Sequence, residues 1–229
     1  MECDVDIIIP AYNEAPCIRR VVEPLQALAR RVVVVDNGST DATADEAREG
    51  GAIVVHEPHR GYGRACLTGL AYLSADPPDV VAFMDGDLAD DPADFPALLR
   101  QILEGADLVI GSRVTGESER GALSPHQAFG NWLATRLIQG LYGVSFTDLG
   151  PFRMVRWSAL QRIEMRDEDF GWTVEMQVRA AKLGLRCAEV PVRYRRRVGV
   201  SKISGTLRGS FMAGTIILST IARERVRRG

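Results

Sequence analysis

Residues 80–92, VVAFMDGDLADDP, join a short apolar segment to a run of aspartates. The apolar part has the composition of a strand buried in a sheet, and Asp85 and Asp87 follow it on either side of Gly86. Side chains two positions apart in an extended segment point to the same side, so both carboxylates emerge together. Paired hard oxygen donors suit Mg²⁺ or Mn²⁺, which commonly bridge to a phosphate. The stretch therefore predicts a divalent-cation or substrate site.

A plainer interpretation treats these aspartates as an acidic loop that opens a helix, where negative charge is favoured. That interpretation accounts well for the later residues Asp90, Asp91 and Asp94. We therefore assign the cation or substrate role to Asp85 and Asp87 only.

Short segments rich in Val and Ile alternate with segments of helical spacing along the first half of the chain. The predicted strands are 5–10, 31–36, 52–56, 80–84 and 107–112, and the predicted helices are 16–29, 42–49, 63–74 and 95–104. Continuous apolar strands alternating with helices are typical of a parallel sheet covered on both faces. We therefore expect an α/β fold in which ligands bind at the carboxyl ends of the strands.

Polar residues follow the first two predicted strands as well, in IIIPAYNEAP (7–16) and VVVVDNGSTDAT (32–43). A carboxylate at Asp36 can accept from a base N–H or a ribose hydroxyl. An Asx-turn followed by a helix cap explains the same residue equally well.

The second half is less regular, with predicted helices at 125–142, 173–183 and 207–222 and predicted strands at 152–156 and 185–192. Residues 194–205, YRRRVGVSKISG, have the composition of a loop. We therefore expect one domain over 1–192 and, as an extension of it, a basic flexible loop and amphipathic helix over 193–229.

Charge is divided unevenly between the two halves. Residues 1–120 hold 22 acidic and 10 basic residues, whereas residues 121–229 hold 8 acidic and 18 basic residues, and the net charge is only −2. The basic half predicts an anionic partner. Four scattered cysteines without a CxxC spacing indicate free thiols in a cytoplasmic protein.

The motifs at 7–16, 32–43 and 80–92, together with RGYGRAC at 60–66, resemble in order and spacing the family 2 glycosyltransferases of the GT-A fold. The remainder resembles their polyprenyl-phosphate branch, the dolichyl-phosphate mannosyl- and glucosyltransferase-like enzymes. The segments that carry this second resemblance are 110–113, 147–155, 171–184, 189–197 and 199–205.

The resemblance implies an inverting, metal-dependent transfer of glucose or mannose from a UDP- or GDP-sugar to a polyprenyl phosphate, with Mg²⁺ or Mn²⁺ as cofactor. It also implies roles for individual residues. The nucleotide-sugar would contact Pro10, Tyr12, Glu14, Asp36, Asp85 and Gly86, and the cation would bind Asp85 and Asp87.

By the same resemblance, the donor phosphates and the acceptor would contact Arg113, Arg196, Ser201 and Lys202. Asp148 and Glu175 would lie near the reacting centre, so the expected catalytic set is Asp148, Arg113, Arg196 and Glu175. A turn residue at Asp148 and a salt-bridged Glu175 are the structural alternatives. A hydroxyl acceptor with the same donor chemistry stays open, and it would need Asp148 or Glu175 as base.

Three features depart from the family pattern. The family's arginine and serine on the helix after residues 110–113 have no clear match, and the nearest residues here are His126, Gln127 and Asn131. Asn37 stands where an aspartate is usual, and Ala89 replaces a glutamine that often follows the paired aspartates. The ribose contact and one metal ligand therefore differ from the best-known members.

The basic C-terminal segment has an apolar helix face, and the lipid acceptor that the resemblance implies favours peripheral contact of this segment with an anionic membrane, at the inner face of a plasma membrane. A helix packed on its own domain, or on a second copy in a homo-oligomer, is the alternative. We expect no nucleic-acid partner, because carboxylates and not basic residues line the predicted strand ends. A haloacid-dehalogenase-like phosphatase would leave the first-strand motif unexplained.

Overall fold

The computed structural model describes residues 3–198, 215 and 219–225. Ser201 and Lys202, and most of the predicted helix at 207–222, lie outside the described residues. The predicted division of the chain after residue 192 stays a prediction.

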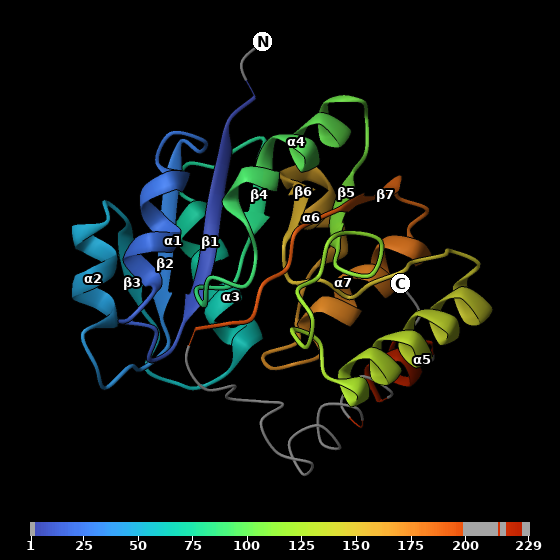
Figure 1. The fold of residues 1–229 in the computed structure, drawn as a ribbon. Helices are drawn as coiled ribbons and strands as arrows, with labels where there is room; N and C mark the ends of the chain where they lie inside the picture. Colours follow the sequence, from blue (N-terminus) through green and yellow to red (C-terminus); the bar gives the residue numbers. More distant parts are fainter. Residues whose placement is uncertain (1–2, 199–214, 216–218, 226–229) are drawn as a thin grey trace.

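One seven-stranded sheet forms the centre of the molecule, in the order β3-β2-β1-β4-β6-β5-β7 (Figure 1). The strands are β1 (Val5–Ala11), β2 (Arg31–Asp36), β3 (Ile53–His56), β4 (Val80–Phe83), β5 (Leu108–Ser112), β6 (Arg153–Arg156) and β7 (Cys187–Pro191). Only β6 runs antiparallel to its neighbours β4 and β5. The predicted α/β fold with a mostly parallel sheet is therefore confirmed.

Helices cover both faces of this sheet, as continuous apolar strands require. One core packs Ile7 and Ile9 of β1 with α1 (Ile18–Leu25), α2 (Thr43–Glu49) and α4 (Phe95–Leu103). The other packs Ile8 with α3 (Tyr62–Leu73), α5 (Pro125–Tyr142), α6 (Trp157–Ile163) and α7 (Trp172–Lys182). Figure 1 shows α1 in front of the sheet and α3 behind it. Alternate residues of β1 thus face opposite cores.

Two elements differ from the sequence prediction. The first predicted helix is shorter, because it ends in tight turns in which the Gln26 amide donates to the Glu23 carbonyl at 3.3 Å. Residues 157–163 form a seven-residue helix that the sequence analysis did not assign. Seven residues span about two turns, too few for a repeating apolar pattern to stand out.

The described C-terminal residues 219–225 are helical and pack against the domain itself. Ile221 is buried, its carbonyl accepts from the Tyr142 hydroxyl at 2.9 Å, and the Glu224 carbonyl accepts from Lys182 at 2.7 Å. Arg223 pairs with Asp167 at 3.2 Å. This part of the segment therefore follows the structural alternative. Among the described residues, no helix is both long and apolar enough to cross a membrane.

Candidate active site

A cleft of about 390 Å³ opens at the edge where β1, β2 and β4 end. Its size lies within the range of small-molecule sites. The residues that line it come from six parts of the chain: Pro10, Ala11, Tyr12, Glu14, Asn37, Arg60, Gly61, Tyr62, Asp85, Gly86, Asp87, Asp169, Phe170 and Arg197.

The loops that follow β1 and β2 hold each other in place. The Asn13 amide donates to Ser39 at 3.0 Å, and the Glu14 amide donates to Thr43 at 2.8 Å. In return, the Thr40 amide donates to the Asn13 side chain at 2.8 Å. These bonds explain why both loops are rich in short polar residues, and they position Tyr12 and Glu14 at the cleft.

Asn37 holds the loop at residues 57–61, which lies along the cleft. Its side-chain nitrogen donates to the carbonyls of Glu57 and His59 at 3.2 and 2.6 Å, and its oxygen accepts from the Gly61 amide at 2.9 Å. A carboxylate at this position could not donate to two carbonyls, so the asparagine matches its surroundings. The loop that it holds carries Arg60, whose guanidinium carbon lies 3.1 Å from the centre of the Tyr12 ring.

Two glycines of the RGYGRAC motif permit a close approach of the chain around residues 167–168. A Cβ atom at Gly63 would collide with the Asp167 carbonyl, and one at Gly61 would collide with the Glu168 carbonyl. The contact is bonded as well, since the Arg64 amide donates to the Glu168 carbonyl at 2.8 Å. This approach brings Phe170 to the cleft.

The paired aspartates line the cleft directly after β4. Asp85 accepts from the Tyr62 hydroxyl at 3.1 Å, while Asp87 accepts from the Ala89 amide at 3.0 Å and pairs with Arg197 at 3.3 Å. Leu88, directly after them, has a left-handed φ of 63°. That conformation costs a leucine about 1–2 kcal/mol, so the turn is strained where the carboxylates project.

Negative charge is concentrated around this turn. Burial and the neighbouring Asp87 charge raise the pKa of Asp85 to about 6. Asp90 is 3% exposed, and neither of its carboxylate oxygens has a hydrogen-bond partner among the residues that the structure describes. Burial and the Asp85 charge raise the pKa of Asp90 as well. Hard oxygen donors with excess negative charge are the donor set that fits Mg²⁺ or Mn²⁺.

Asp90 does not line the cleft, however. Within the described part of the chain, no three His, Cys, Asp or Glu side chains converge as metal ligands. The protein therefore offers Asp85 and Asp87, and a cation held there would need further ligands from water or substrate.

Arg113, at the end of β5, is bound to Asp148 in the segment before β6. Its Nε and Nη2 atoms lie 2.8 and 2.7 Å from the two carboxylate oxygens, and its amide donates to the same carboxylate at 2.8 Å. Asp148 is fully buried and also accepts from the Leu149 amide at 2.7 Å. Asp148 therefore orients Arg113, whose guanidinium also lies over the Tyr194 ring at 5.0 Å.

A second cavity, of about 400 Å³, begins at Arg113 and runs along α5. Its apolar lining includes Val114, Leu123, Trp132 and Phe146. Trp132 is 52% exposed, which is unusual for a tryptophan on a helix surface. This cavity joins a cationic end to an apolar wall.

Residues 6–164 match the sequence family Glycosyl transferase family 2. The chain belongs to this family. The predicted recognition as a family 2 glycosyltransferase is thus confirmed.

The glycosyltransferase has relatives that match over nearly their whole length. It is 37% identical over 211 residues to an uncharacterized glycosyltransferase of Mycobacterium tuberculosis, a match that covers 91% of this chain and 94% of the relative. It is 32% identical over 227 residues to the dolichyl-phosphate hexose transferase of Haloferax volcanii, covering 98% and 96%. It is 31% identical over 215 residues to the undecaprenyl-phosphate mannosyltransferase of Micrococcus luteus, covering 88% of each chain.

The glycosyltransferase also shares its fold with a solved structure, that of glucosyl-3-phosphoglycerate synthase from M. tuberculosis in complex with Mn²⁺, UDP-glucose and phosphoglyceric acid. The TM-score is 0.77 at 24% identity, and the match covers 99% of this chain and 81% of that one. The likeness confirms the predicted GT-A fold.

Most of the residues predicted to contact the nucleotide-sugar or the cation lie together in the cleft of this glycosyltransferase. Pro10, Tyr12, Glu14, Gly86 and the paired aspartates all line it. Asp36 does not: its carboxylate accepts from the Ser39 amide at 3.0 Å and contacts His56 at 3.1 Å.

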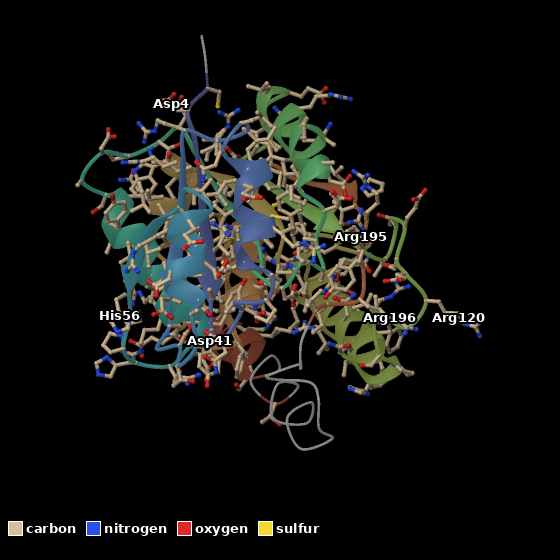
Figure 2. All side chains as sticks on the ribbon, turned by 60° about the vertical axis from the view of Figure 1, so that its left-hand side comes forward. Asp4, Asp41, His56, Arg120, Arg195 and Arg196 are labelled. Atoms are coloured by element: carbon tan, nitrogen blue, oxygen red, sulfur yellow. The ribbon has the colours of Figure 1, made fainter. Side chains whose placement is uncertain are left out.

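The residues predicted for the reacting centre are arranged differently. Glu175 is fully buried and accepts from the amides of Arg166 and Asp167 at 2.9 and 2.7 Å, away from both cavities. Arg196 donates to the Arg120 carbonyl at 3.0 and 2.7 Å, and Figure 2 shows these two residues together at one side of the molecule. Arg197 lines the cleft instead.

Several residues that line the cleft were not predicted as site residues, namely Asn37, Arg60, Tyr62, Asp169, Phe170 and Arg197. The RGYGRAC motif was a usable signal for the residues around 60–62. No local pattern marks Asp169 and Phe170, because tertiary packing against α3 brings them there.

Proposed function

We propose that this glycosyltransferase moves glucose or mannose from a UDP- or GDP-sugar to a polyprenyl phosphate with inversion at the anomeric carbon. The observation that carries the proposal is that each cavity is lined by residues at the carboxyl end of parallel strands: the cleft at β1, β2 and β4, and the second cavity, through Arg113, at β5. The acidic cleft suits a nucleotide-sugar, and the second cavity offers a cation and an apolar wall. The names of the H. volcanii and M. luteus relatives agree with this substrate class.

The donor would lie across the carboxyl ends of β1, β2 and β4. Tyr12, with Arg60 over its ring, provides an aromatic surface for the base, and Glu14 provides an acceptor for ribose hydroxyls. Asp85 and Asp87 would hold Mg²⁺ or Mn²⁺ against the diphosphate. When bound, the cation neutralises the charge that grows on the leaving group.

In the proposed step, an acceptor phosphate oxygen attacks C1 of the sugar. The bond between C1 and the diphosphate oxygen breaks, and its electron pair leaves with the nucleoside diphosphate. A phosphate acceptor needs no base because it is already ionised at neutral pH. Arg113 would bind it, since guanidinium groups recognise phosphate with paired hydrogen bonds.

A hydroxyl acceptor fits this site less well. It would need a base, and the carboxylate of Asp148 already accepts four hydrogen bonds. Glu175 is fully buried, and its carboxylate accepts hydrogen bonds from two backbone amides. Both groups therefore support neighbouring structure, which favours an acceptor that arrives without a proton to lose.

The apolar wall of the second cavity would hold the first isoprene units of the acceptor. Trp132 and Phe129, which is 62% exposed, lie on the same helix α5 and form an aromatic contact with ring centres 5.9 Å apart. Exposed aromatic residues of this kind are typical of a membrane interface. We propose peripheral contact with the inner leaflet of the plasma membrane, where such an acceptor would be presented.

Purified full-length protein, Mn²⁺ and either UDP-glucose or GDP-mannose should convert a short polyprenyl phosphate into a glycolipid detected by mass spectrometry. The matching polyprenol, which lacks the phosphate, should give no product. Absence of glycolipid with every UDP- and GDP-hexose donor would overturn the proposed acceptor. Product from the polyprenol would show that a hydroxyl acceptor is used.

A further inference from the structure

Residues 193–198, which we call the strap, run beside the aspartate turn. The Arg195 amide donates to the Ala89 carbonyl at 2.8 Å, and the Val198 amide donates to the Asp87 carbonyl at 3.0 Å. Because backbone bonds on both sides of Arg197 tie the strap to this turn, the turn determines where the Arg197 side chain lies.

Arg197 differs from the other arginines of the strap. Its Nη1 atom lies 3.3 Å from Oδ2 of Asp87, inside the cleft. The others bind groups that do not line the cleft: Arg193 pairs with Asp94, Arg195 with Asp91, and Arg196 with the carbonyl of Arg120. One arginine is therefore directed at the paired aspartates.

Arg60 is the other basic residue among the described lining of the cleft, but it lies over the Tyr12 ring. Among the described residues, Arg197 is therefore the cationic partner of Asp87. Asp87 is 4% exposed, and a buried carboxylate without a partner is costly. The ion pair meets this requirement.

The same carboxylate is the proposed ligand for the divalent cation. A cation bound to Asp87 would meet the positive charge of the guanidinium at short range, and the two would repel each other. The diphosphate of a nucleotide-sugar is negative and attracts both. The charge of Arg197 therefore disfavours binding of the divalent cation and favours binding of the diphosphate.

We propose that Arg197 is a placeholder for the cation: it neutralises Asp87 before substrates bind, yields this carboxylate to the divalent ion, and then pairs with the donor diphosphate. The inference rests on the proposed function, because it requires both a cation and a nucleotide-sugar in the cleft. Its consequence is that the cation and the donor bind cooperatively, each weakly without the other.

The test measures binding and not turnover. Mn²⁺ is titrated into the full chain without nucleotide, and free Mn²⁺ is followed by electron paramagnetic resonance. Arg197→Gln should bind Mn²⁺ about fivefold or more tightly than the parent protein, a typical size for a coupling between two ligands. Arg197→Lys, which keeps the charge, should stay near the parent value.

The second measurement is the affinity for UDP-glucose and GDP-mannose at saturating Mn²⁺. Arg197→Gln should bind the accepted donor about tenfold more weakly, because a charge-assisted contact to the diphosphate is lost. Arg195→Gln is the matched control, since it removes the same charge from the same strap outside the cleft. It should leave both affinities at the parent values.

A purely structural role for Arg197 would weaken both affinities together, so the opposite signs are diagnostic. Mn²⁺ binding to Arg197→Gln that is no tighter than to the parent overturns the inference, as does absence of Mn²⁺ binding in both proteins. If Arg197→Gln binds Mn²⁺ no more tightly than the parent protein, and the parent protein still makes glycolipid, only the placeholder role fails. Tighter Mn²⁺ binding without any glycolipid product supports the placeholder role and overturns the proposed acceptor.

Discussion

The guanidinium of Arg113 donates hydrogen bonds to both oxygens of the Asp148 carboxylate, from Nε at 2.8 Å and from Nη2 at 2.7 Å. Asp148 is fully buried, and the side chain of Arg113 is only 13% exposed. Removing one partner of such a buried pair costs about 3–5 kcal/mol, because the other charge is left without compensation. The contact thus joins the stability of the domain to the position of a proposed phosphate-binding group.

Asp148→Asn should lower the free energy of unfolding by about 3 kcal/mol and greatly reduce transfer, because an amide cannot accept all the bonds that now converge on the carboxylate. Urea denaturation measures the first effect, and glycolipid formation measures the second. Glu164→Gln is the control: this carboxylate is 58% exposed and pairs with Arg166 and, at 3.7 Å, with Arg179, so the change should alter stability by less than about 1 kcal/mol. Unchanged stability of Asp148→Asn would contradict the positioning role.

Asp87→Ala should abolish the Mn²⁺-dependent thermal stabilisation by the accepted nucleotide-sugar while the fold persists. The reason is linkage: a donor complex that no longer forms cannot stabilise the folded state. Thermal-shift curves with and without Mn²⁺ check this, and circular dichroism checks the fold. Asp45→Ala, whose side chain is 78% exposed, should keep the stabilisation. Turnover that survives in Asp87→Ala would show that the cation assignment is wrong.

Asn37→Asp would restore the residue usual in the family, yet it should damage this protein. The variant loses both donor bonds to the carbonyls of Glu57 and His59, at a cost of about 1–3 kcal/mol in the free energy of unfolding. Affinity for the nucleotide-sugar should fall as well, because the same loop carries Arg60. Urea denaturation and donor titration measure the two effects. Tighter donor binding by the variant would mean that position 37 contacts the ribose.

Asp90→Asn should stabilise the metal-free protein at alkaline pH. Because burial raises the pKa of Asp90 in the folded state, this group supports folding below its unfolded pKa of about 4 and loses that contribution as the pH rises through the folded value. The variant lacks this loss, so its advantage should grow from pH 4 to pH 8 and reach about 1–3 kcal/mol.

Denaturation in EDTA across this pH range provides the measurement. Asp91→Asn is the matched control: Asp91 accepts from the Ala93 amide and pairs with Arg195, so its replacement should destabilise the protein. A parent protein more stable than Asp90→Asn at pH 8 would indicate that Asp90 has a partner in solution.

Trp132→Ala should raise the KM for polyprenyl phosphate about tenfold without changing the KM for the donor, because the ring contributes apolar surface to the second cavity alone. Steady-state kinetics with a short-chain acceptor measure both constants. Leu103→Ala removes a side chain that is 62% exposed on α4 and should change neither. An unchanged KM for the acceptor would place the isoprene chain elsewhere.

The α/β fold and six of the fourteen residues that line the cleft could be predicted from the local sequence pattern. The polar residues that follow an apolar run mark where each strand ends, and the carboxyl ends of parallel strands lie at one edge of the sheet. Tyr12, Glu14 and the paired aspartates could therefore be grouped without coordinates, although they lie far apart in the chain. This reasoning did not extend to Asp36, which turns to Ser39 and His56.

The other residues of the cleft are brought there by contacts between segments that are far apart in the chain. The strap is irregular, and whether Arg196 or Arg197 faces the cleft depends on the backbone bonds that it makes to Asp87 and Ala89, about a hundred residues earlier in the chain. The same holds for Phe170, which packing against α3 delivers to the cleft, and for the carboxylate of Asp148, which is committed to Arg113. Such positions are set by long-range packing and hydrogen bonds, whose energies no local pattern of residues encodes.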